Sequence, residues 1–312
     1  MNRRVPLPEP LGSRPFLLSE SDGLSVPRRR TAANDVRTPS RAIRVPVGVE
    51  LSLLQRCRPY TDVTPGSVIS HFTAARIHGF PMPVDFDWPP LLDVARPRGA
   101  AAPRRKHVRG RRLRLDEGDI VTLDGVAVTS RARTWLDLGS VFGVGDLVVI
   151  ADYLVSEHNR NFGPAREAMV PLDELRAYIE SKSRIPGLAM CRQALGLVRV
   201  GVDSPQESLL RLMLQRAGLP EFHPNYPICD TSGYPRIWTD LGCPEFRTCV
   251  EYEGTHHLSA EQQASDHDRD FTTSSLLWHQ AKINKTDMKR GEVHVVGKVS
   301  RMLKRGGWEP KA

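Results

Sequence analysis

The sequence predicts an α/β protein (α+β overall), and three observations support that fold class. A length of 312 residues favours two domains and is enough for each to bury a core. Apolar residues at helical spacing dominate residues 130–200. Runs rich in β-branched and aromatic residues, bounded by turn residues, occur in 91–129 and 238–253. We therefore expect a mixed helical and β N-terminal part, followed by a C-terminal mixed sheet flanked by helices.

The N-terminal segment is rich in chain-breaking residues. Residues 1–15 contain five prolines and glycines, which predicts a disordered or loosely attached tail. Two short helical segments and then a β-like run follow within 16–46, an order that suggests a small, degenerate winged helix whose Arg28–Arg30 run contacts phosphates. An irregular basic arm is the alternative, because short helices with little amphipathic character are marginal by themselves.

Helical and β patterns then succeed each other in an orderly way. Residues 67–80 predict a helix that ends at Gly79, because glycine is a common helix stop and prolines follow it. Residues 91–129 predict β-strands, and Asp124-Gly125 between two apolar runs is typical of a two-residue hairpin. Ser130 is expected to cap the first of several helices that continue to residue 200.

The densest positive patch of the chain lies among these β segments. It consists of Arg104, Arg105, Lys106, Arg109, Arg111, Arg112 and Arg114. The whole chain carries 44 Lys and Arg against 36 Asp and Glu, a balance that favours polyanionic partners through counterion release. We therefore predict contact with nucleic acid, DNA in the first place. A solvated edge strand kept soluble by its charge is the competing interpretation.

Composition also restricts the cellular setting. The five cysteines are scattered without a C-x-x-C pair, which argues against a zinc ribbon and against a disulfide framework. A reducing cytoplasm is the expected location. Neither a membrane-spanning apolar run nor a signal peptide is evident, so we expect no membrane association.

The stretch 238–257 contains three carboxylates that converge if it folds as a hairpin. Asp240 lies in a first β-like run, and the segment 242–245 predicts a turn because Gly and Pro punctuate it. In the second run, Glu251 and Glu253 lie on one side, because successive strand side chains alternate between faces. Pairing of the two runs brings Asp240 beside Glu251.

Crowded carboxylates repel one another unless a cation neutralises them. Oxygen ligands suit Mg²⁺ (or Mn²⁺), which keeps several waters for a phosphate substrate. Asp240, Glu251 and Glu253 are the expected metal ligands, and His257, with His256 second, is expected to handle protons or the phosphate. Together these residues indicate metal-assisted hydrolysis of a phosphodiester. A solvated hairpin with acids on its outer face is the alternative.

The pattern D-x(10)-E-Y-E-G-x-H-H, from Asp240 to His257, resembles the core of the PD-(D/E)XK nuclease superfamily. It is most similar to domains like the very-short-patch-repair endonucleases. The resemblance implies a restriction-endonuclease-like domain over 201–312, Mg²⁺-dependent cleavage of DNA, and a role for Glu207 near the metal on the first helix. Two departures stand out: Glu253 occupies an expected Asp position, and the motif lysine is missing, with Lys282 or Lys285 as replacements.

A second resemblance covers the N-terminal part. The patterns S-x-x-T-A-A-x-x-H-G at 70–79 and V-T-S-x-x-R-T-W-L-D-L at 128–138 resemble AbiEi-type antitoxin-related proteins of actinobacteria. This implies an AbiEi-like region over 16–200 attached to the endonuclease domain. Two functions stay open: an endonuclease, or a non-catalytic DNA-binding regulator or type IV antitoxin-like protein that retains a nuclease fold. A stable domain with neither activity is a third outcome, and any partner toxin is unidentified.

Overall fold

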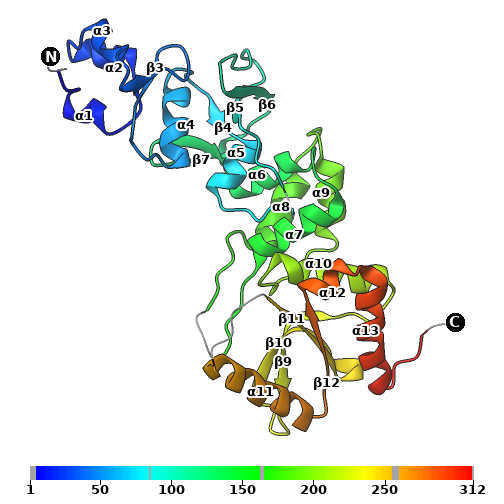
Figure 1. Ribbon diagram of the computed structural model, residues 1–312. Coiled ribbons are helices and arrows are strands. Elements are labelled where there is room, and N and C mark those ends of the chain that lie inside the picture. The colour runs from blue at the N-terminus through cyan, green and yellow to red at the C-terminus, as the bar shows by residue number, and fades with distance from the viewer. Residues whose placement is uncertain (1–4, 84–85, 162–164, 255–259, 311–312) are drawn as a thin grey trace. The chain divides into compact units, whose positions relative to one another are not determined.

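The computed structural model describes residues 5–83, 86–161, 165–254 and 260–310, with side chains in the last range described from His267 onward. In these residues it contains 13 α-helices and three β-sheets, two of which mix parallel and antiparallel strands, so the predicted α/β class is confirmed (Figure 1). The chain divides into two compact units. Unit 1 comprises residues 1–142 with 178–191, and unit 2 comprises 143–177 with 192–312.

Unit 1 begins with a small three-stranded antiparallel sheet of order β1-β3-β2. Its elements are α1 (Glu9–Gly12), β1 (Phe16–Leu17), α2 (Leu18–Gly23), α3 (Arg28–Thr31), β2 (Val36–Arg37) and β3 (Ile43–Pro46). The order is helix, strand, two helices and two strands, and the winged helix stays a prediction. The structure differs from the loose tail predicted for 1–15, because Leu11 and Phe16 are fully buried in a cluster with Val26 and Val36.

The rest of unit 1 is built on a five-stranded sheet of order β6-β5-β4-β8-β7. Its elements are α4 (Leu53–Asp62), β4 (Val68–Ile69), α5 (His71–Ile77), β5 (Leu92–Pro97), β6 (Val108–Leu113), β7 (Ile120–Leu123), β8 (Val126–Thr129) and α6 (Arg131–Leu138). The predicted hairpin at Asp124-Gly125 is confirmed, with Leu123 opposite Val126 and positive φ angles at both turn residues, as a tight two-residue turn requires.

Buried ion pairs explain much of the V-T-S-x-x-R-T-W-L-D-L pattern. Ser130 caps α6 by accepting a hydrogen bond from the Arg133 backbone N–H. The Arg133 guanidinium is 1 % exposed and donates to Asp119 Oδ2 at 2.6 Å and to Asp137 Oδ1 at 2.9 Å. Buried charges of this kind are stable only when paired. The pattern therefore has a structural role in unit 1.

Unit 2 contains a four-stranded mixed sheet of order β12-β11-β10-β9, in which β11 and β12 are parallel. Its elements are α7 (Val144–Val155), α10 (Pro205–Arg216), β9 (His223–Cys229), β10 (Pro235–Cys243), β11 (Thr248–Glu253), α11 (Ala260–Ser275), β12 (His279–Asn284), α12 (Lys285–Lys289) and α13 (Glu292–Arg305). The chain passes between the units within α8 (Leu172–Ser181) and α9 (Leu188–Leu195). A C-terminal mixed sheet flanked by helices is therefore confirmed.

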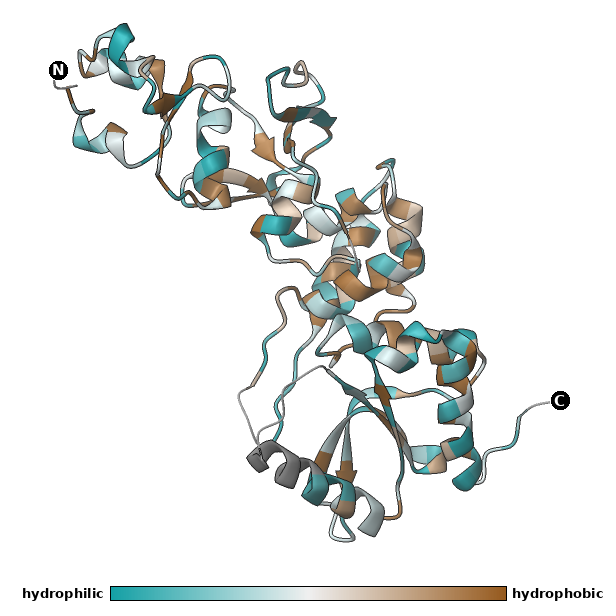
Figure 2. Ribbon diagram, in the orientation of Figure 1, coloured by the Kyte–Doolittle hydropathy of each residue, from teal (hydrophilic) through white to brown (hydrophobic). Residues whose placement is uncertain are grey.

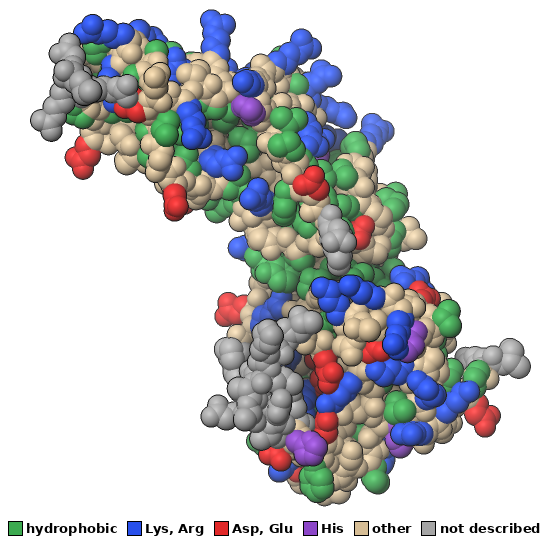
Figure 3. Space-filling model, in the orientation of Figure 1, with side chains coloured by type: hydrophobic (Ala, Val, Ile, Leu, Met, Phe, Trp, Pro, Cys, Tyr) green, Lys and Arg blue, Asp and Glu red, His purple; other side chains and the backbone are tan. Residues whose placement is uncertain are grey.

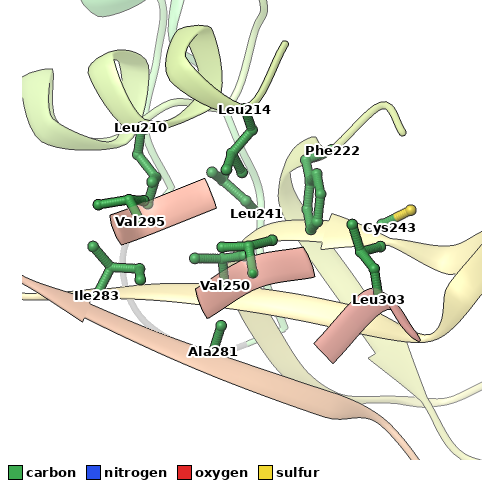
Figure 4. Close-up of a cluster of buried hydrophobic side chains, with 11 residues drawn as sticks. Leu210, Leu214, Phe222, Leu241, Cys243, Val250, Ala281, Ile283, Val295 and Leu303 are labelled. Atoms are coloured by element: carbon green, nitrogen blue, oxygen red, sulfur yellow. The ribbon is translucent and has the colours of Figure 1, made fainter. Parts of the chain in front are cut away.

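One face of this sheet packs on α10 and α13. Figure 4 shows Leu210 and Leu214 of α10 directed towards strand residues such as Val250, with Val295 of α13 beside them. Apolar and polar residues share α13, as the brown and teal segments of Figure 2 show, because only one side of the helix is buried. Strand β12 is an edge strand with Ile283 buried and its other face half-exposed, which accounts for its polar composition.

Helix α7 belongs with the C-terminal sheet, although the predicted domain boundary lies at residue 200. Asp152 of α7 is fully buried and accepts hydrogen bonds from Arg211 Nη2 at 2.7 Å and from Ser208 Oγ at 2.8 Å, both on α10. The Arg199 backbone N–H donates to its other oxygen at 2.8 Å. The observed boundary therefore differs from the predicted one, because Asp152 forms its hydrogen bonds with residues of unit 2. No helix in the described residues is long and apolar enough to span a bilayer.

Candidate active site

The predicted hairpin is present and carries the acids as expected. Strands β10 and β11 pair antiparallel with Leu241 opposite Val250, and this register places Asp240 opposite Glu251. The Tyr252 backbone N–H donates to Asp240 Oδ2 at 2.7 Å. The two carboxylates predicted to meet therefore lie on neighbouring strands.

A third carboxylate comes from α10. Ser204 caps this helix and Pro205 begins it, so Glu207 lies in the first turn. Glu207 is mostly buried, and its Oε2 accepts from the Asp203 backbone N–H at 2.9 Å. Burial raises the pKa of Glu207 above its ordinary value.

The three carboxylates influence one another electrostatically. Burial raises the pKa of Asp240 well above its ordinary value, and the negative charges of Glu251 and then Glu207 raise it further. The Tyr252 N–H bond and the charge of Arg269 oppose this rise. An acid in such a position binds a proton or a cation more readily than an ordinary aspartate does.

Arg269 of α11 is a residue that the sequence interpretation missed. Its Nη2 donates to Glu251 Oε1 at 2.8 Å and also to the Trp238 carbonyl oxygen. The Glu251 side chain is 13 % exposed, so this ion pair is partly shielded from solvent. The available sequence signal was the charged Asp268-Arg269-Asp270 run in the helix that follows the hairpin.

Glu253 occupies a more exposed position than the other acids. Its Oε1 lies 3.4 Å from Lys282 Nζ, which also donates to Asp270 Oδ2 at 2.6 Å. In the parallel register Lys282 lies opposite Glu251, whereas Lys285 is exposed at the start of α12. Of the two lysines considered as replacements for the motif lysine, Lys282 is therefore the one beside the acids. Glu253 has this lysine as its partner.

A cavity of about 390 Å³ opens over these side chains. Its charged lining residues are Arg160, Asp240, Glu251, Glu253, Arg269, Asp270 and Lys282. Among the described residues no three His, Cys, Asp or Glu side chains are grouped closely enough to hold a metal by themselves. The predicted proton carriers His256 and His257 lie outside the described residues. Of the residues that the structure describes, four acids and three cations thus line one hollow.

The predicted nucleic-acid cluster at 104–114 separates into two groups. Arg109 Nε and Arg111 Nε lie 3.4 Å and 2.9 Å from Oδ1 of the fully buried Asp93, so both contribute to the fold. Arg105 is half-buried and donates to the Arg41 carbonyl at 2.5 Å. The exposed members are Arg104, Lys106, Arg112 and Arg114. Lys and Arg side chains project from the region of β5 and β6 in Figure 3.

Comparison of the chain with protein-family models and with curated proteins finds no match. The geometry of the two units is therefore the basis for assigning a function.

Proposed function

We propose that unit 2 is a metal-dependent endonuclease that hydrolyses phosphodiester bonds of nucleic acid, DNA in the first place. The observation that carries the proposal is the half-buried Asp240, opposite Glu251 in the strand register, with a pKa that the charges of Glu251 and Glu207 help to raise. Like charges gathered out of water are destabilising unless a cation offsets them. A fold that holds Asp240 beside Glu251, with the charge of Glu207 acting on Asp240, gains stability when a divalent ion binds there.

The donor set fits Mg²⁺ or Mn²⁺. Asp240 and Glu251 would hold the ion, since Mg²⁺ is usually bound by one or two carboxylates and keeps its remaining positions for water and phosphate oxygens. When bound, such an ion polarises the phosphate and lowers the pKa of the attacking water. Glu207 adds negative charge beside Asp240. Glu253 serves less well as a ligand, because Lys282 lies 3.4 Å away.

The cations of the cavity have a matching role. Lys282, Arg160 and Arg269 line the same hollow as the acids. Positive side chains placed beside a phosphodiester orient it and offset charge that develops during hydrolysis. Lys282 thereby takes the role proposed for the missing motif lysine. His257 and His256, which follow β11 in the sequence, remain the proposed proton carriers.

Unit 1 supports the choice of nucleic acid as substrate. Its exposed Arg104, Lys106, Arg112 and Arg114 are suited to phosphate contacts, which supply affinity without sequence preference. A cytoplasmic location is part of the proposal, and the five unpaired cysteines, four of them buried, suit a reducing compartment.

A second function is favoured by one observation. Arg269 Nη2 lies 2.8 Å from Glu251 Oε1 and neutralises this acid without an ion. Such an arrangement suits a DNA-binding regulator or antitoxin-like protein that keeps the nuclease fold for binding. A partner toxin belongs to this second function, and its identity is open.

Nicking of supercoiled plasmid in Mg²⁺ tests the proposal. Glu251→Gln keeps the shape of the side chain and removes its charge, so we expect the rate to fall by about 10²–10³, while circular dichroism stays unchanged. Glu253→Asp should keep its activity, because this side chain faces Lys282. Glu309→Gln, an exposed acid of unit 2 that does not line the cavity, is the matched control. Full activity of Glu251→Gln contradicts the endonuclease and leaves the regulator.

A further inference from the structure

A second hollow in unit 2 adjoins the candidate active site. It has a volume of about 1360 Å³ and lies along the edge strand β12 and the helix α13. Asp270, Gln280 and Lys282 line both this hollow and the cavity over the carboxylates. We call it the β12 groove. The β12 groove therefore shares a wall with the cavity that Asp240 and Glu251 line.

The β12 groove is strongly positive. Arg301, Lys304 and Arg305 lie on one side of α13, because residues three and four apart share a helix face. Arg247 faces them from the turn between β10 and β11. Unlike Lys282 and Lys298, these four cations have no acidic partner within 4 Å among the residues that the structure describes. Figure 3 shows Lys and Arg side chains gathered over α13.

Apolar and aromatic side chains line the same groove. Phe246 and Trp278 are half-buried, and Leu277 is 67 % exposed. Leu277 is also held at φ +59°, a left-handed conformation that is unfavourable for leucine. An exposed apolar residue in a strained conformation beside a tryptophan offers a surface on which a flat ring can lie.

These two properties distinguish a single strand from a duplex. A duplex presents phosphates on its outside and keeps its bases stacked inside, so it can use the cations and not the apolar lining. A single strand uses both, since its bases stack on aromatic and apolar side chains while its phosphates meet Lys and Arg. The combination of Trp278 and Leu277 with four unpaired cations matches the single strand.

We propose that the β12 groove binds single-stranded DNA and leads it towards the carboxylates. The delivery of the strand for cleavage rests on the proposed endonuclease function, whereas the binding itself does not depend on that function. Two observations carry the inference: the groove combines positive and apolar side chains, and it shares a wall with the candidate active site.

Fluorescence anisotropy of the full chain in EDTA tests the binding, with a labelled mixed-sequence oligonucleotide as single strand and as duplex. We expect the single strand to bind about tenfold more tightly, and the Arg301→Glu/Lys304→Glu variant to lose at least about tenfold for the single strand. Lys285→Glu/Lys289→Glu, on the exposed α12 outside the groove, is the matched control and should keep full affinity.

Equal affinity for both forms, or equal losses in the groove variant and the α12 control, overturns the inference. Single-strand binding by Glu251→Gln, compared with plasmid nicking by the wild type, tests the groove and the endonuclease separately. If it binds the single strand normally and the wild type nicks no plasmid in Mg²⁺, the groove stands and the endonuclease fails. If the wild type nicks plasmid without preferring the single strand, the endonuclease stands and the groove fails.

Discussion

Replacing Asp240 by Asn should stabilise the protein in the absence of metal. The folded-state pKa of Asp240 is raised, first by burial and then by the charges of Glu251 and Glu207. The folded state therefore binds a proton more tightly than the unfolded chain. Stability is highest below the ordinary aspartate pKa of about 4 and falls as the pH rises through the raised folded-state value. Asparagine removes this loss because it cannot ionise.

The size of the effect follows from the surroundings of Asp240. An uncompensated buried charge destabilises a protein by about 3–5 kcal/mol. The hydrogen bond from the Tyr252 N–H to Asp240 at 2.7 Å stabilises the ionised carboxylate by about 1.5–3 kcal/mol, the usual strength of a hydrogen bond to a charged group. Between about 0 and 3.5 kcal/mol of destabilisation therefore remains at neutral pH, and the positive charge of Arg269 favours the lower part of this range. For a unit of this size each kcal/mol shifts Tm by about 2–4 °C.

Thermal unfolding followed by circular dichroism measures this prediction. In EDTA at neutral pH, Asp240→Asn should raise Tm by up to several degrees, and the gain should shrink at acidic pH. Added Mg²⁺ should raise the Tm of the wild type and leave that of the variant unchanged. At an Mg²⁺ concentration 100 times Kd, binding increases the free energy of unfolding of the wild type by about 2.7 kcal/mol. Glu309→Gln serves as control for the loss of one exposed charge. A lower Tm in EDTA, or an identical metal response in both proteins, refutes the reasoning.

Two further predictions concern the buried ion pairs. Asp152→Ala leaves Arg211 buried without its partner, and we expect a loss of about 3–5 kcal/mol in urea unfolding of unit 2; a loss below about 1 kcal/mol contradicts the assignment of α7 to this unit. Arg111→Glu should lower Tm because it places a negative charge against buried Asp93, whereas Arg112→Glu should keep Tm and weaken duplex DNA binding with a smaller salt dependence. Equal Tm values for these two variants would show that the contact of Arg111 with Asp93 does not contribute to the stability of the fold.

The local features of the site were predictable from the sequence. Gly and Pro in 242–245 specify a turn, and alternation of faces along the second run fixes which acids lie together. These constraints act within about ten residues, so Asp240 and Glu251 were placed opposite each other without knowledge of the tertiary fold. The place of Glu207 on the first helix, near the metal, was expected only from a resemblance.

Long-range pairing was not predictable in the same way. The ion pair of Asp93 with Arg111 joins β5 and β6, which are parallel neighbours linked by a long connection, and no local pattern in the sequence identifies it. Composition shows a run of arginines. It does not show which of them form ion pairs with a buried acid and which remain exposed. Arg269 is a similar case, because its partner Glu251 lies on a strand that precedes its helix.

Arg269 also decides how the two candidate functions relate to each other. A guanidinium and a divalent ion both stabilise the charge of Glu251, and each repels the other at short range. In an endonuclease, Asp240 and Glu251 would hold the ion, and Arg269, which lines the same cavity, would be placed to bind a phosphate. In a regulator, the ion pair at 2.8 Å is the resting and final state of the site. The metal response of Tm separates the two states, because only in the first does Asp240 gain a cation.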